Sequence, residues 1–296
     1  MREGTRASNG FLYGLSAYLI WGLFPLYWQL LQPASSLEIL AHRIAWSVFV
    51  MVALLFASRR VPEFRAILAS PRTTRLLVAA AVLVSVNWGT YIWGVNNGHV
   101  VETALGYFIN PLVNVSMGVV IMGERLRKVQ WIALAFAFVA VLVLAWDYGR
   151  PPYVALTLAF SFALYGLLKK KADVDAIESL TFETLLISPV AFGYLIYLGV
   201  SGQSAFGSHG VTHALLLAST GIATAGPLLM FGAAAIRVKL STLGLLQYIA
   251  PTSQFVIGLI VFHETMTHVR WIGFVMVWIA LAIFTADALR HYRNTR

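Results

Sequence analysis

Long apolar runs, separated by short connectors, dominate this chain from end to end. A helix that crosses a bilayer needs about 20 mostly apolar residues, each adding about 1.5 Å of length. Ten runs meet this requirement, at residues 10–31, 36–57, 74–95, 102–122, 128–147, 152–169, 178–199, 212–235, 240–262 and 269–289. The sequence therefore predicts an all-α integral membrane protein with ten transmembrane helices and no soluble domain.

The composition agrees with a surface that mostly faces lipid. Hydrophobic residues make up 59% of the 296 residues and charged residues only 11%, against about 25% charged in a typical globular domain. The chain has no cysteine, which excludes disulfides, thiolate metal sites and nucleophilic cysteines. We expect no metal and no cofactor.

Lysine and arginine are concentrated in alternate connectors. Of the 21 such residues, 18 fall on one side of the predicted membrane, two on the other, and one, Arg43, within a run. By the positive-inside rule, both termini are then cytoplasmic. This pattern also explains the net charge of +9, so nucleic acid is not an expected partner. The longest connector, 58–73, is either a short helix on the inner leaflet or a plain basic loop.

The second half of the chain repeats the first. Residues 111–133 match residues 251–273 at a fixed offset of 140. The identical pairs include Pro111 and Pro251, Gly118 and Gly258, Glu124 and Glu264, and Trp131 and Trp271. The two recurring glutamates are expected to cap or anchor helix ends.

This repeat predicts how the chain is divided. The two halves, residues 1–150 and 151–296, hold five predicted spans each. An odd number of spans forces the halves into opposite orientations in the membrane. The expected fold is therefore two inverted five-helix repeats, with a binding site near the midplane between them, as in many secondary transporters.

Several short motifs resemble one transporter family. They are Gly-Tyr-Phe-Ile-Asn-Pro-Leu at 106–112, Gly-Glu at 123–124, and the Trp-Ile pairs at 131–132 and 271–272. Their order resembles the EamA-type transporters of the drug/metabolite transporter superfamily, most closely the RarD subfamily. The resemblance implies a bacterial cytoplasmic (inner) membrane protein that exports or exchanges a small molecule, and it implies no particular substrate.

Ionisable groups inside a span are costly and are functional candidates. Arg43 lies about two turns inside its span, beside His42. The offset of 140 pairs Arg43 with Glu183, and Glu38 with Glu178. Opposite charges at pseudo-symmetric positions could serve as inner and outer gates, or could neutralise a substrate or a proton.

These charged groups also have plainer interpretations. Arg43 could reach outward to a lipid phosphate, and Glu183 could pair with the lysines at 169–171. Arg43, His42 and Glu183 remain the candidates for gating or proton coupling. A cationic Arg43 would favour an anionic or zwitterionic substrate.

Prolines interrupt three predicted spans. Pro111, Pro227 and Pro251 are expected to break helical hydrogen bonds, since proline lacks the backbone N–H and clashes with the preceding turn. The freed carbonyls must be buried or face a wet cavity. The candidate lining residues are Asn87, Tyr107, Asn110, Gln247, Tyr248 and Gln254, and the candidate aromatic walls are Trp21, Trp88, Tyr91 and Tyr165. For each residue, an interhelical hydrogen bond or ordinary packing is the alternative.

No motif favours an enzyme or an ATP-driven pump. The chain has neither a Walker-type phosphate loop nor a Gly-x-Ser-x-Gly nucleophile elbow. We expect a secondary transporter that exports a small metabolite or drug-like molecule by alternating access, with a membrane-embedded receptor or sensor as the alternative. The expected partners are the lipid bilayer and an anionic, zwitterionic or aromatic small molecule. The sequence sets no oligomeric state and is compatible with a monomer.

Overall fold

A computed structural model describes residues 2–122, 126–235, 237 and 246–294, and every regular element within them is a helix. The helices are α1 (Arg2–Leu30), α2 (Ser36–Ala57), α3 (Val61–Ala69), α4 (Pro71–Asn96), α5 (Val100–Met122), α6 (Lys128–Tyr148), α7 (Tyr153–Ala172), α8 (Ala176–Val200), α9 (Gly210–Ala235), α11 (Ile249–Ile260) and α12 (His268–Asn294). Glu124, one of the two recurring glutamates, lies outside the described residues.

Seven of the described helices are long and apolar enough to cross a membrane. They are α1 from Asn9, α2, α4, α6, α8, α9 to Phe231, and α12 to Asp287. Shorter apolar helices cover Tyr153–Lys169 in α7 and Ile249–Ile260 in α11. The prediction of an all-α membrane protein is confirmed at this level, and the protein is a multi-pass one.

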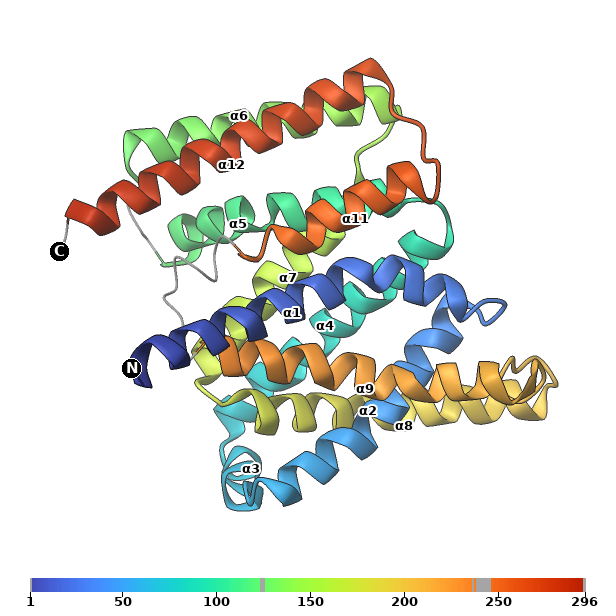
Figure 1. Ribbon diagram of the computed structural model, residues 1–296. Coiled ribbons are helices and arrows are strands. Elements are labelled where there is room, and N and C mark those ends of the chain that lie inside the picture. The colour runs from blue at the N-terminus through green and yellow to red at the C-terminus, as the bar shows by residue number, and fades with distance from the viewer. Residues whose placement is uncertain (1, 123–125, 236, 238–245, 295–296) are drawn as a thin grey trace.

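The bundle has two distinct ends. Helix α1 begins and α12 ends on the same side, where α3 also lies (Figure 1). We call this the terminal end. The connectors 31–35, 97–99, 149–152, 201–209 and 261–267 lie on the other side, which we call the far end (Figure 1).

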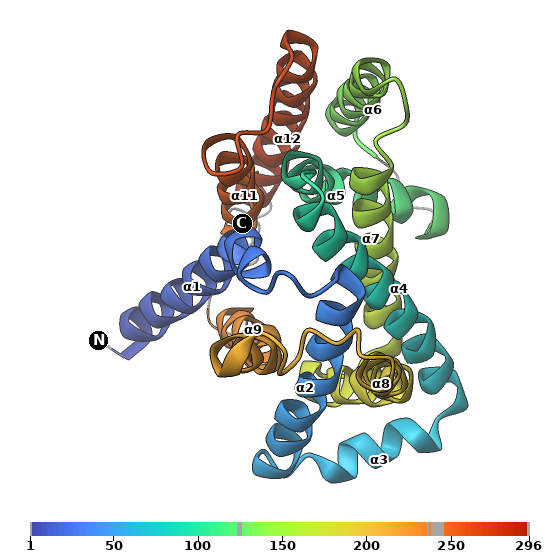
Figure 2. The same ribbon diagram turned by 90° about the vertical axis from the view of Figure 1, so that its right-hand side faces the viewer.

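The helices stack in layers between two edges. Helices α6 and α12 lie side by side at one edge, and α5 and α11 lie next to them (Figures 1 and 2). Helices α2 and α8 pack together near the opposite edge, beside α9 (Figures 1 and 2). Buried aliphatic and aromatic side chains such as Phe274, Leu144 and Leu105 form the core between α5, α6 and α12.

Two helix crossings depend on glycine. At Gly221 of α9, a Cβ atom would lie 2.6 Å from the carbonyl carbon and oxygen of Trp46 in α2. At Gly106 of α5, a Cβ atom would lie 2.8 Å from the carbonyl oxygen of Ala155 in α7. Small residues let membrane helices approach this closely and gain packing contacts. The two glycines therefore set how near α9 comes to α2, and α5 to α7.

The prolines affect their helices less than the sequence suggested. Helices α5 and α9 continue through Pro111 and Pro227, because one missing hydrogen bond leaves the rest of the helical ladder intact. Pro251 lies in the first turn of α11, where its missing N–H needs no helical partner. The interruption near Pro251 is the turn at residues 247–248 that precedes α11.

Helix α3 decides between the two interpretations of the longest connector. Residues Val61–Ala69 are helical, with Ile67 buried against Leu77 and Phe182. The neighbouring Leu68 is exposed. The connector is thus a short amphipathic helix docked on the bundle by its apolar face.

Glu264 caps the start of α5 from the far-end connector 261–267. Its two carboxylate oxygens accept the backbone N–H groups of Val100 at 2.5 Å and Val101 at 2.9 Å. The first N–H groups of a helix have no partner within the helix, so these bonds satisfy two of them. The expectation that Glu264 caps or anchors a helix end is met in this geometry.

A pH dependence of stability should follow from this cap. Burial raises the pKa of Glu264 above its ordinary value, and the bonds from Val100 and Val101 only partly offset that. The folded protein then holds a proton that the unfolded chain releases, so this group's contribution to stability falls as pH rises between the two pKa values. Thermal unfolding between about pH 4 and about pH 7 should show this slope, and Glu264→Gln should flatten it. Equal slopes in both proteins would contradict the prediction.

Candidate functional site

Arg43 is a buried cation where helices from both parts of the chain meet. It is the eighth residue of α2 and is only 5% exposed. Its Nε donates a hydrogen bond to Oγ1 of Thr224 in α9 at 3.0 Å, and Thr224 donates in turn to the carbonyl of Thr220 at 2.9 Å. Arg43 therefore points into the bundle, and the alternative in which it reaches lipid phosphate does not hold.

Aromatic rings surround the guanidinium. The Arg43 Cζ atom lies 3.9 Å from the ring centroid of Trp88, 5.2 Å from that of Trp28 and 5.9 Å from that of Phe24. Within about 6 Å, the negative face of an aromatic ring attracts a cation. Tyr91 is buried in the same cluster as Phe24 and Trp28, and Tyr107 packs against that cluster, with its ring edge-on to Tyr91. We call Phe24, Trp28, Trp88, Tyr91 and Tyr107 the aromatic cage.

Within the described part of the chain, no carboxylate forms an ion pair with Arg43. By contrast, buried carboxylates in that part of the chain do have cationic partners: Glu102 pairs with Arg150 at 3.1 Å and Glu183 with Lys169 at 2.8 Å. A buried charge without an opposite charge is unfavourable by several kcal/mol. Among the described residues, Arg43 is therefore held by aromatic faces and one hydroxyl.

Three amides predicted to line a cavity bridge neighbouring helices. Asn87 Nδ2 donates to the carbonyl of Leu158 and to Oγ of Ser161, each at 3.0 Å. Asn110 and Gln254 donate to the main-chain carbonyls of Ala159 and Trp21 respectively, also at 3.0 Å. All three amides therefore make hydrogen bonds between helices, which is the alternative to lining a cavity.

The other predicted lining residues differ in what they contact. Tyr107 donates to Oδ1 of Asn87 at 3.3 Å and packs edge-on against Tyr91. Trp21 packs against Tyr18 and Phe231. Gln247 and Tyr248 are half-buried in the turn before α11. Of the four aromatic walls predicted, Trp88 and Tyr91 belong to the cage, while Phe24 and Trp28 were not foreseen.

Glu183 forms a paired group apart from Arg43. Its carboxylate accepts from Lys169 Nζ at 2.8 Å and from the Tyr165 hydroxyl at 3.1 Å, and it is 1% exposed. Glu183 is thus paired with one of the lysines at 169–171, which was the plainer interpretation of this residue. Tyr165 thus contacts Glu183 rather than the guanidinium.

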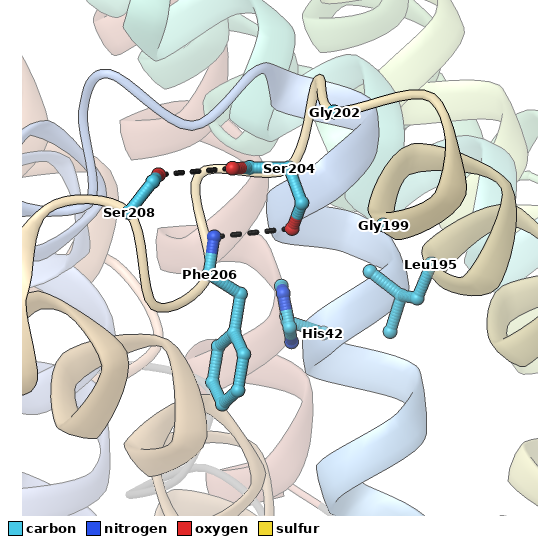
Figure 3. A pocket seen from close by; sticks show the side chains of 7 residues that line it. All are labelled: His42, Leu195, Gly199, Gly202, Ser204, Phe206 and Ser208. Atoms are coloured by element: carbon cyan, nitrogen blue, oxygen red, sulfur yellow. Dashed lines mark hydrogen bonds between the residues drawn. The ribbon is translucent and has the colours of Figure 1, made fainter.

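At the far end, the buried carboxylate of Glu38 holds the connector 201–209. Its Oε1 accepts the Ser204 hydroxyl at 3.0 Å and the Ala205 N–H at 2.8 Å. His42 lies 4.0 Å from that carboxylate and stacks on Phe206, with ring centroids 4.9 Å apart. Figure 3 shows His42 and Phe206 facing each other beside an open pocket of about 410 Å³. We call the contact of Glu38 with Ser204 and Ala205 the far closure.

At the terminal end, Glu178 makes the corresponding contact with the segment that follows α2. Its Oε1 accepts from Arg60 Nη1 at 2.8 Å, and Arg60 also reaches Asp175 at 2.5 Å. Glu178 is 1% exposed, whereas Asp175 is largely exposed. The two carboxylates hold the pKa of the Arg60 guanidinium above its ordinary value. We call this contact the terminal closure.

Comparison with known proteins shows which family the chain belongs to. Residues 8–146 match the EamA-like transporter family. The protein RarD of Streptomyces exfoliatus is 56% identical over 100% of this chain and 94% of its own length. The chain belongs to the EamA-type transporters, RarD subfamily. The resemblance drawn from the motifs is thereby confirmed.

Further relatives agree with this assignment. This EamA-type chain is 42% identical to the uncharacterized transporter YojE of Bacillus subtilis over 99% of each chain. A solved crystal structure superposes with a TM-score of 0.61 at 19% identity, covering 96% of this chain and 98% of its own, which supports the fold alone. The protein is a membrane transporter.

Proposed function

We propose that this protein is a secondary transporter that exports a small molecule across the bacterial cytoplasmic membrane by alternating access. Its ten spans form two inverted halves, residues 1–150 and 151–296. The terminal end, which carries most of the lysine and arginine, faces the cytoplasm. Arg43 and the aromatic cage form the substrate site between the halves.

The pattern of helix contacts supports the inverted repeat. In such a repeat, α1, α2, α4, α5 and α6 are equivalent, in that order, to α7, α8, α9, α11 and α12. Most of the main helix contacts then have a counterpart, in which each helix is replaced by its equivalent in the other half. The contact of α4 with α7 becomes that of α9 with α1, and α5 with α7 becomes α11 with α1. The contact of α2 with α9 becomes that of α8 with α4. The pairs α2–α8, α5–α11 and α6–α12 turn into themselves.

The single observation that carries alternating access is the pair of closures. Glu38 and Glu178 are separated by the repeat offset of 140, and both are almost fully buried. Each is bonded near the start of its helix to the segment that follows the other helix. The same device thus closes the bundle at its two opposite ends, which is what a transporter that opens one end at a time requires.

Flux through the purified protein tests this proposal. Proteoliposomes would be loaded with a pooled metabolite extract, and efflux followed by mass spectrometry with and without a pH gradient. We expect selective efflux that falls at least about tenfold in Arg43→Ala, since this change removes the central cation. The exposed arginine of α3 gives the control Arg65→Ala, which should transport normally.

The other outcomes are equally informative. Folded protein without selective efflux would favour a receptor or sensor. Unchanged efflux in Arg43→Ala would show that the path avoids the aromatic cage. A gradient dependence that disappears in Glu183→Gln, but persists in His42→Gln, would assign the coupled proton to Glu183.

A further inference from the structure

Several hydrogen-bond donors at Arg43 and in the aromatic cage have no partner among the described residues. Among the described residues, the two terminal nitrogens of Arg43 donate to no side chain or carbonyl, since its one hydrogen bond is made by Nε. The indole Nε1 of Trp28 and the hydroxyl of Tyr91 are buried without a partner. Buried polar groups almost always have partners, so two such groups beside an unpaired guanidinium require an explanation.

The chemistry of these groups indicates what is missing. The guanidinium and the indole N–H can only donate, and the tyrosine hydroxyl can donate. Ser47, one turn beyond Arg43 on the same side of α2, is a further buried hydroxyl without a partner. An acceptor that carries negative charge would satisfy these donors and neutralise Arg43.

The shape of the cage adds a second requirement. Rings of Trp88 and Trp28 lie against the guanidinium, and the outer edge of a guanidinium matches the two oxygens of a carboxylate. A molecule bound through that edge would extend its remaining atoms among tryptophan and tyrosine rings. Flat aromatic groups fit such surroundings because ring pairs gain energy beyond simple burial.

We infer that Arg43 binds the carboxylate of a small aromatic acid, and that Trp28, Trp88 and Tyr91 contact the ring system joined to it. This inference rests on the proposed transport function and names its substrate class. A zwitterion fits less well, because no described carboxylate pairs with Arg43 or lies in the cage to hold an ammonium group. Since Arg43 is only 5% exposed, the acid would enter when one closure opens.

Binding to the full-length protein in nanodiscs, measured by calorimetry, tests the inference without any flux. The probes are benzoate, 3-phenylpropionate and indole-3-acetate, each paired with its primary amide, which keeps the shape and removes the charge. At least one acid should bind at least about tenfold more tightly than its amide, the equivalent of about 1.4 kcal/mol. Phenylalanine, which adds only an ammonium group to 3-phenylpropionate, should bind more weakly than that acid.

Variants locate the binding site. Arg43→Gln should weaken binding of the acid at least about tenfold, and Arg43→Lys, which keeps the charge but not the fork, should restore part of it. Arg65→Gln, on the exposed surface of α3, should bind like the wild type. If Arg43→Gln fails to fold, the preference of the wild type for acids over amides still decides the question.

Three results of the binding measurements would overturn the inference. They are equal binding of acids and amides across the panel, unchanged acid binding in Arg43→Gln, and tighter binding of phenylalanine than of 3-phenylpropionate. Selective efflux of a neutral metabolite without acid binding would overturn the inference and leave transport standing. Acid binding that depends on Arg43, without any flux, would overturn the transport function and leave the binding inference standing.

Discussion

Glu38→Ala is expected to expose the centre of the bundle to the outside, and Glu178→Ala to expose it to the cytoplasm. Each change removes a buried carboxylate that holds one closure through hydrogen bonds to the opposite segment. A hydrogen bond to a charged group contributes about 1.5–3 kcal/mol. Loss of one such contribution shifts an opening equilibrium about 10- to 100-fold.

The chain offers a clean way to measure this effect. It contains no cysteine, so Ser47→Cys, one turn beyond Arg43, would carry the single thiol. A membrane-impermeant thiol reagent should then label Glu38→Ala about 10- to 100-fold faster from outside intact cells. Glu178→Ala should gain the same factor in inside-out vesicles and lose labelling from outside. Glu63→Ala, an exposed carboxylate on α3, is the matched control.

Opposite changes in the two variants are the signature of alternating access. Faster labelling from both sides in either variant would indicate a pore or a loosened bundle. Unchanged labelling in both would mean that Glu38 and Glu178 hold connectors without controlling access. The fully buried side chain of Ser47 in the present conformation provides the low starting rate that the test needs.

Gly221→Ala is expected to destabilise the protein markedly more than Gly226→Ala in the same helix. The new Cβ would meet the main chain of Trp46 at 2.6 Å, and main-chain atoms cannot turn aside as a flexible side chain can. Overpacking of this kind costs about 1–3 kcal/mol. It would also separate α9 from α2 one turn away from the hydrogen bond between Arg43 and Thr224.

Gly226→Ala supplies the control within the same helix. A Cβ atom there has nothing within 4 Å, and alanine favours a helix over glycine by up to about 1 kcal/mol. Thermal unfolding in detergent should therefore show a lower midpoint for Gly221→Ala and an equal or higher midpoint for Gly226→Ala. Equal unfolding midpoints for the two variants would show that α2 and α9 are not in close contact in the detergent-solubilised protein.

The helices were predictable because membrane spans are a local property. Twenty apolar residues with a basic connector on one side define a span without reference to the rest of the fold. For the same reason Arg43 was recognisable as a charge inside a span. The effect of Pro111 and Pro227 was overestimated, since the loss of one hydrogen bond does not end a well-packed helix.

Contacts between distant residues were not predictable from spacing. Glu38 meets Ser204 and Ala205 across a sequence separation of 166 and 167 residues, and nothing local to either segment indicates that pairing. Three of the five cage residues, Trp88, Tyr91 and Tyr107, were predicted because they lie near polar residues in their own spans. Phe24 and Trp28 were not, since only the placement of α1 brings them close to Arg43. Asn87 and Asn110 each donate to a main-chain carbonyl, of Leu158 and Ala159 respectively, and a main-chain acceptor leaves no mark in a sequence.

The edge formed by α6 and α12 has a mechanical consequence. These helices are the last of each half of the chain and pack through small residues, including Gly273 against Leu144 and the buried Ala133, Ala137 and Ala140. The pair lies farthest from α2 and α8, at the other edge of the bundle (Figure 2). If the two halves turn about this pair, displacement grows with distance from the axis. A rotation of a few degrees would then leave the hinge packed while moving Glu38 and Glu178, at the long end of the lever, by the greatest amount.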